Sequence, residues 1–157
     1  MRTQVTGQPK STVILRARAK GVSHSRADVT VRDLTFSIDE PTERGGSNAG
    51  ATPTEMALAA LVGCTNVIGH KCAARLGLDI GELDIDASCE FDRLGVTQVE
   101  EIDVPFKSIT LQVASSGAAS EADLARLSEE VERFCPLSKL FRNAGTRLRV
   151  TWTKQND

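Results

Sequence analysis

The stretch ATPTEMALAALVGCTNVIGHKCAARLG, residues Ala51–Gly77, decides the fold. It carries little charge and begins with a helix-start pattern: Thr52 is the predicted N-cap, Pro53 the first helical residue and Glu55 the reciprocal partner of a capping box. Apolar residues then follow on nearly every side, which is typical of a helix buried on most sides. A chain of 157 residues has difficulty surrounding such a helix, so we expect a second subunit to cover it.

Length and composition indicate an ordinary globular protein. We expect residues 1–157 to form a single domain, with residues 1–11 as a loose, polar arm. The formal net charge of -2 and the absence of long like-charge blocks argue against nucleic-acid binding. The first residues include no apolar signal segment, and no apolar run is long enough to predict a membrane span. We therefore expect a cytoplasmic protein with no membrane partner.

Strands are predicted on both sides of the long helix from alternating apolar and polar residues. Those before the helix are short and separated by tight turns, which indicates an antiparallel meander. The element order is βββ-α-ββ-α-β, an α+β arrangement. The predicted strands are 12–20, 27–32, 34–38, 83–93, 109–113 and 147–152, and the predicted later helices are 120–134 and 137–144.

The helix predicted over residues 120–134 is amphipathic, with Ser120 as its cap. Pro136 cannot donate a backbone hydrogen bond, so we expect the helix to kink or restart at Cys135. We expect the short helix that follows to stop at Gly145, because helix ends prefer glycine. The predicted apolar stripe of the amphipathic helix is Leu124, Leu127, Val131 and Phe134.

Two of the four cysteines, Cys64 and Cys135, occupy marked positions. Each lies at a predicted helix break, because Gly63 weakens the helix before Cys64 and Pro136 follows Cys135. If a new helix begins at either cysteine, its free amides face the sulfur and favour the thiolate. The alternative is a pair of buried, inert thiols, and the spacing by itself does not decide between the two.

Of the other two cysteines, Cys89 is expected to be a packing residue, and Cys72 is expected to lie too far from Cys64 for a disulfide unless the helix unwinds. Cys89 lies on the apolar side of the strand predicted at residues 83–93, and Cys72 follows Cys64 by about two helical turns. The chain has no CxxC pair and only two histidines, so we expect no zinc site. A cysteine hydrolase is also disfavoured, because His70 lies on a different helical face from Cys64.

The segments PTEMALAALVGC and CPLSK together resemble the OsmC/Ohr family, the osmotically inducible protein C and organic hydroperoxide resistance proteins. The GG-x-x-x-G loop before the long helix and the three N-terminal strands fit as well. The resemblance covers residues 13–152, and FCPLSK is nearer to the broader OsmC-like branch. It implies antiparallel sheets wrapped around central helices in an intertwined homodimer, with active sites at the subunit interface.

The resemblance also implies a thiol peroxidase that needs no metal or organic cofactor. Cys64 matches the peroxidatic cysteine and Cys135 the resolving one. Arg26 is the best match to the arginine that supports the thiolate, with Arg32 as the alternative, and Glu55 matches the glutamate that would hold this arginine. The expected substrates are organic hydroperoxides and, more weakly, hydrogen peroxide. The expected reductant is a dithiol, either a small molecule or a lipoyl- or thioredoxin-type protein.

A function of another class stays open from the sequence. In this alternative the protein is not catalytic, and the apolar crevice of the dimer binds a small hydrophobic ligand or the cysteines sense redox state. The natural hydroperoxide and the physiological reductant are not encoded in any motif of the chain.

Overall fold

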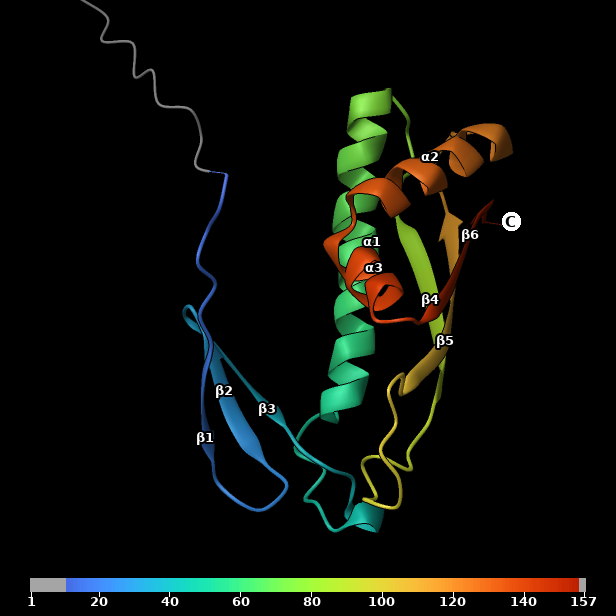
Figure 1. The fold of residues 1–157 in the computed structure, drawn as a ribbon. Helices are drawn as coiled ribbons and strands as arrows, with labels where there is room; N and C mark the ends of the chain where they lie inside the picture. The colour runs from blue at the N-terminus through green and yellow to red at the C-terminus, as the bar shows by residue number, and fades with distance from the viewer. Residues whose placement is uncertain (1–10, 156–157) are drawn as a thin grey trace, which may run out of the picture. The chain divides into compact units, whose positions relative to one another are not determined.

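A computed structural model describes residues 11–155, so residues 1–10 of the expected arm lie outside the described part. The chain divides into two compact units, residues 1–53 and residues 54–157. Figure 1 shows the ribbon of both units. Element order and composition confirm the predicted α+β class, with the second helical segment split in two.

The N-terminal unit is a three-stranded antiparallel sheet of order β1-β2-β3. Its strands are β1 (Arg18–Gly21), β2 (Ala27–Val31) and β3 (Leu34–Ile38). Strands β2 and β3 confirm the predicted strands at residues 27–32 and 34–38. The prediction that the first strand begins at residue 12 was wrong. Arg18 already pairs with Thr30, close to the end of β2, so residues 12–17 have no strand beside them to complete a ladder.

The loop that follows β3 is organised around the buried carboxylate of Asp39. This carboxylate accepts hydrogen bonds from the Ser47 hydroxyl at 2.5 Å and from the backbone N–H groups of Glu40, Ser47 and Ala49. The bonds from Ser47 and Ala49 hold the pKa of Asp39 well below its usual range, because they stabilise the charged form. The loop, which includes the short 3-10 helix η1 (Thr42–Arg44), is therefore closed by one buried charge.

Two glycines of the GG-x-x-x-G loop are required by close backbone approach. A Cβ atom at Gly46 would lie 1.8 Å from the carbonyl oxygen of Glu40, and one at Gly50 would lie 2.0 Å from that of Ser37. Neither distance is compatible with a side chain, so only glycine fits at these positions. The motif is thus a packing requirement of the N-terminal unit.

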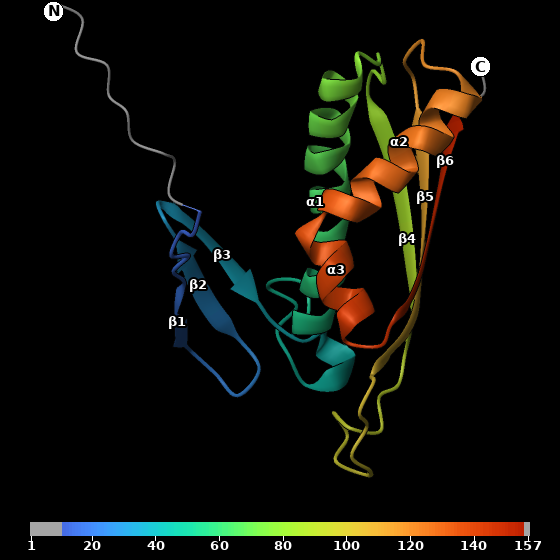
Figure 2. The ribbon, with the colours of Figure 1, turned by 45° about the horizontal axis from the view of Figure 1, so that its top comes forward.

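The C-terminal unit packs three helices on a three-stranded sheet of order β4-β5-β6. Strands β4 and β5 are antiparallel, and β5 and β6 are parallel, with Leu111 opposite Val150. The helices lie on one side of this sheet (Figure 2). The elements are α1 (Pro53–Leu76), β4 (Leu83–Phe91), β5 (Phe106–Ser115), α2 (Glu121–Phe134), α3 (Pro136–Asn143) and β6 (Arg147–Lys154).

Helix α1 buries one face in this unit and leaves the other exposed. Along its buried face, Gly69 lets the helix approach Trp152 of β6: a Cβ there would lie 2.7 Å from the indole ring. On the opposite face, Val67 is 49% exposed. The length and composition of α1 would also suit a membrane span, a property shared by core helices of soluble domains. The residues of the buried face are Leu61, Thr65, Gly69, Cys72 and Ala73.

The predicted helix break at Gly63 was wrong, because α1 runs without interruption through Gly63 and Cys64. A glycine in a helix interior costs only about 1 kcal/mol relative to alanine. That cost is small beside the stabilisation that α1 gains by burying Leu61, Cys72 and Ala73 in the core. The free amides that a new helix would have offered to Cys64 at this position are therefore absent from α1.

Most of the predicted α2 stripe is confirmed, with one exception at its end. Ser120 caps the helix by accepting from the Asp123 N–H, and Leu124, Leu127 and Val131 are buried. Phe134 was predicted in the same stripe but is 47% exposed. The guanidinium of Arg75 lies 4.5 Å from its ring centroid, so a cation covers part of this aromatic surface.

Candidate active site

The structure brings Cys64 and Cys135 together. Cys64 lies near the middle of α1 and is half-buried, whereas Cys135 lies at the junction of α2 and α3 and is fully buried. Their Sγ atoms are 3.2 Å apart, within hydrogen-bond distance for two sulfurs. Both cysteines are free thiols. Two segments that are distant in the sequence therefore place their sulfurs in direct contact.

Pro136 fixes the position of Cys135. Because proline lacks an N–H group, α2 ends at Phe134, and the Cys135 N–H makes its last helical bond, to the Val131 carbonyl at 2.8 Å. Pro136 then occupies the first position of α3, where no N–H is needed. Cys135 is thus the N-cap of α3, and its sulfur accepts from the Ser138 N–H at 3.4 Å. The predicted restart at Cys135 is confirmed.

The start of α3 faces both sulfurs. Besides the Ser138 amide at Cys135, the backbone N–H of Leu137 acts on Cys64 and lowers its pKa. From the sequence, such amides are expected at Cys64 only if a new helix begins there, whereas in the structure the amide that acts on Cys64 comes from α3. Leu137 and Ser138 were not identified from the sequence, although Pro136 at a helix start implies that the next two N–H groups are free.

Burial dominates the electrostatics of Cys64. Burial raises the pKa of its thiol to about 11, the contact with Cys135 adds to the shift, and the Leu137 amide opposes it. Lys71 is the cation that lowers this pKa, and its effect is the smallest of these. With these neighbours alone, Cys64 is a protonated thiol at neutral pH. A nucleophilic role requires a further positive charge close to the sulfur.

Arg26 and Arg32, the two candidate arginines, lie in the N-terminal unit. Arg26 comes just before β2 and binds Asp28 with two prongs, Nε to Oδ1 at 2.8 Å and Nη2 to Oδ2 at 3.2 Å. The Ser37 hydroxyl donates to the same carboxylate at 2.7 Å. These bonds raise the pKa of Arg26 and lower that of Asp28. Asp28 thus orients the Arg26 side chain, a role that sequence reasoning did not assign to it.

The remaining predicted site residues are placed by local structure. Arg32 lies exposed in the turn between β2 and β3 with a left-handed φ of 57°. Glu55 lies in the first turn of α1, on the same continuous helix as Cys64. Arg26 and Arg32 belong to one compact unit, and Glu55 and the two cysteines belong to the other.

Cys72 and Cys89 both pack in the C-terminal unit, as the sequence predicted for Cys89. Cys72 is buried in the core, and Cys89 packs against the core from the inner face of β4. Burial raises the pKa of both thiols. Cys89 also lines an apolar cavity of about 210 Å³ between α1 and the sheet. The other residues that line it are Thr54, Glu55, Leu58, Ala87, Ser88, Phe91 and Phe106.

Within residues 11–155 no group of three or more His, Cys, Asp or Glu side chains is arranged to hold a metal ion. The chemical resources of the site are therefore a contacting pair of thiols and the amides of a helix start. A pair of this kind can exchange between dithiol and disulfide.

Comparison with known proteins assigns the family. The family model for OsmC-like protein matches residues 45–151, so the chain belongs to the OsmC-like family. No protein of curated function matches the sequence. The matched range includes α1 with Cys64 and the α2–α3 junction with Cys135.

Solved structures of this family share the fold at low sequence identity. An OsmC-like protein from Mycoplasma pneumoniae is 16% identical and superposes with a TM-score of 0.77, covering 92% of this chain and 99% of that one. An organic hydroperoxide resistance protein from Elizabethkingia anophelis is 18% identical with a TM-score of 0.70, covering 94% and 100%. The organic hydroperoxide resistance protein OhrB of Bacillus subtilis is 20% identical with a TM-score of 0.63, covering 90% and 98%. These likenesses confirm the predicted OsmC-like fold.

Proposed function

We propose that the protein is a thiol peroxidase that reduces organic hydroperoxides and, more weakly, hydrogen peroxide. The observation that carries the proposal is the 3.2 Å contact between the sulfurs of Cys64 and Cys135. Membership of the OsmC-like family and the similarity to proteins described as organic hydroperoxide resistance proteins support it.

The proposed reaction uses the two sulfurs in turn. The Cys64 thiolate attacks the distal oxygen of the hydroperoxide, the O–O bond breaks, and the leaving alkoxide takes a proton from water to become an alcohol. Cys64 is then a sulfenic acid. The Cys135 thiolate attacks its sulfur, a disulfide forms, and the hydroxyl group leaves as water after protonation. A dithiol reductant finally returns both cysteines to thiols by exchange.

The difference in exposure between the two cysteines supports this proposed division of roles. Cys64 is partly accessible and Cys135 is fully buried, so a hydroperoxide from solvent reaches the Cys64 sulfur first. The same asymmetry directs the reductant to the Cys64 sulfur of the disulfide, with Cys135 as the leaving thiolate. The Ser138 N–H that bonds the Cys135 sulfur would stabilise that leaving group.

The role proposed for Arg26 gives a prediction on the pH dependence of Cys64. A guanidinium near the sulfur stabilises the thiolate and lowers the thiol pKa, by roughly 1–3 pH units. Arg26→Ala should therefore move the midpoint of Cys64 alkylation upward, toward the value of about 11 that burial imposes. The measurement is the rate of iodoacetamide modification against pH, with Cys64 followed by peptide mass spectrometry.

Arg32→Ala is the matched control for that experiment, since it removes the same charge from the neighbouring turn of the same sheet. It should leave the midpoint close to wild type. If Arg32→Ala raises the midpoint and Arg26→Ala does not, the supporting arginine is Arg32. If neither variant changes it, neither Arg26 nor Arg32 supports the thiolate.

We further propose that the protein is a homodimer. Apolar surface is left open in both units: Val13, Ile14 and Leu15 are each at least 75% exposed, and Val67 is 49% exposed on α1. Surface of this kind is costly in water and marks an interface. Light scattering should give twice the chain mass at micromolar concentration. A monomer under those conditions would contradict a site completed by a second subunit.

A non-catalytic binding protein is the second candidate, because two observations favour it. The raised pKa of Cys64 suits an inert thiol, and the apolar cavity beside Cys89 could hold a small hydrophobic ligand. Titration of free thiols before and after one equivalent of cumene hydroperoxide separates the two functions. Loss of two thiols per chain supports the peroxidase, and an unchanged thiol count supports the binding protein.

A further inference from the structure

The outer face of the second sheet carries a cluster of arginines that the cysteine chemistry does not use. Along β6, buried and exposed residues alternate, so Arg147 and Arg149 both face outward while Leu148 between them faces the core. Same-face neighbours on a strand lie roughly 7 Å apart. In register beside them on β5 are two hydroxyl residues, Ser108 opposite Arg147 and Thr110 opposite Arg149.

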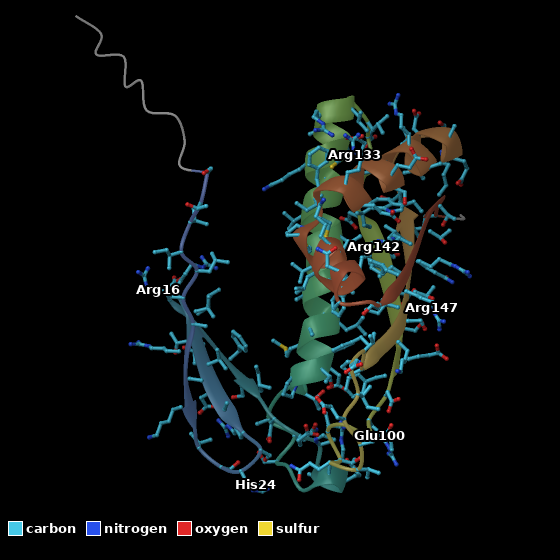
Figure 3. All side chains as sticks on the ribbon, in the orientation of Figure 1. Arg16, His24, Glu100, Arg133, Arg142 and Arg147 are labelled. Atoms are coloured by element: carbon cyan, nitrogen blue, oxygen red, sulfur yellow. The ribbon has the colours of Figure 1, made fainter. Side chains whose placement is uncertain are left out.

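These four residues line one cavity, and Arg142 joins them from α3. Figure 3 labels Arg142 on α3 and Arg147 at the start of β6. The cavity has a volume of about 560 Å³, within the usual range for small-molecule sites. No carboxylate is among the residues that line it. The full lining is Ser108, Ile109, Thr110, Arg142, Arg147, Leu148 and Arg149.

The charges of this cavity are only partly compensated. Arg142 donates to the Glu132 carboxylate at 2.9 Å, which neutralises one of the three guanidinium groups. In the described part of the chain, neither Arg147 nor Arg149 has a side-chain ion pair or hydrogen bond. The cavity therefore keeps about two unpaired positive charges, which matches the charge of a phosphate monoester near neutral pH, about −1.5 to −2.

The neighbouring strand determines where an anion can lie. The Ser108 hydroxyl donates its proton to Glu90 of β4 at 2.6 Å, so this hydroxyl has no proton left for an anion. Glu90, Asp84 and Asp86 form an acidic row on the outer face of β4 and would repel an anion from that side. The Thr110 hydroxyl has no side-chain partner in residues 11–155, so it stays available as a donor in the cavity, in register with Arg149.

We propose that this cavity binds a small organic phosphate, with the phosphate group held between Arg147 and Arg149. Guanidinium groups bind phosphate oxygens in pairs, and two of them on one strand can approach a single phosphate from two directions. The cavity is larger than a phosphate ion requires, so the organic part of the ligand would occupy the space toward Arg142. The proposal is independent of the peroxidase proposal, since it uses none of its residues.

The test is a titration of the full chain with glucose 6-phosphate, inorganic phosphate and glucose at constant ionic strength. Backbone and arginine Nε signals in ¹H–¹⁵N spectra report binding residue by residue. Glucose 6-phosphate should give saturable shifts confined to residues 108–110, 142 and 147–149, and glucose should give none. Inorganic phosphate should shift the same signals more weakly, because it lacks the organic part.

Two double variants with equal charge change make the result decisive. Arg147→Gln with Arg149→Gln should weaken glucose 6-phosphate binding roughly tenfold or more, a loss of about 1.4 kcal/mol or more. Arg16→Gln with Arg18→Gln is the control: these arginines have the same spacing and, with Arg32, line another surface cavity. The control should bind as wild type does. Equal weakening by both pairs, shifts spread over all arginines, or no saturable binding would overturn the proposal.

Discussion

Replacing Cys64 with serine is expected to reduce peroxide consumption to the rate of the uncatalysed reaction. The proposed first step is attack by a thiolate on the distal oxygen, and a serine hydroxyl is not appreciably ionised near neutral pH. We expect no other thiol to take its place, because Cys135 is fully buried and burial raises the pKa of both the Cys72 and the Cys89 thiols. The measurement is consumption of cumene hydroperoxide under an excess of dithiol reductant.

Cys72→Ser and Cys89→Ser are the matched controls, since each removes one of the remaining thiols from the same unit. Both variants should retain turnover close to wild type, because the proposed reaction uses only the sulfurs of Cys64 and Cys135. Full activity of Cys64→Ser, or its loss in Cys72→Ser, would contradict the assignment of Cys64 as the peroxidatic residue.

Features determined by a single residue were predictable from the sequence. Pro136 lacks the N–H group that a helix interior requires, so α2 cannot continue through it, and the junction at Cys135 follows directly. The start of α1 at Pro53 and the stop of α3 near Gly145, which has a left-handed φ of 95°, are local in the same sense. Such rules need no knowledge of the rest of the chain.

Features determined by distant partners were not predictable in this way. Gly63 should weaken a helix, but packing of α1 on the sheet outweighs that local preference. The strand expected from residue 12 begins only at Arg18. A strand requires a neighbouring strand, and β2 is too short to pair with residues 12–17. The parallel pairing of β5 with β6 likewise depends on how α2 and α3 return the chain.

The candidate site likewise combines features that a local motif predicts with features that depend on distant residues. Both cysteines could be singled out from their surroundings, and the resemblance to a family supplied their pairing, but the contact between their sulfurs is a tertiary property. The raised pKa of Cys64 arises mainly from burial, which no motif encodes. The amides of Leu137 and Ser138 lie between these cases, because Pro136 indicated a helix start but not which sulfurs it would face.

Replacing Cys135 with serine should separate the two halves of the proposed reaction. The Cys64 thiol remains, so one equivalent of hydroperoxide should still be consumed and Cys64 should become a sulfenic acid. Without the sulfur that lies 3.2 Å away in the wild type, no disulfide can form within the chain. A dimedone-type reagent should then trap the sulfenic acid, and intact-mass analysis should show one adduct per chain. The wild type should give little adduct, since Cys135 captures the intermediate first.

At higher peroxide the same variant should be over-oxidised. A sulfenic acid that no thiol captures reacts with a second peroxide to give the sulfinic acid, which thiols do not reduce. Intact-mass analysis should therefore show a gain of two oxygens in Cys135→Ser at peroxide levels that convert the wild type only to its disulfide. Cys72→Ser, which keeps Cys135, should behave as wild type in this assay. If Cys135→Ser still formed an internal disulfide while Cys72→Ser accumulated the sulfenic acid, the resolving thiol would be Cys72, and the contact between Cys64 and Cys135 would be structural.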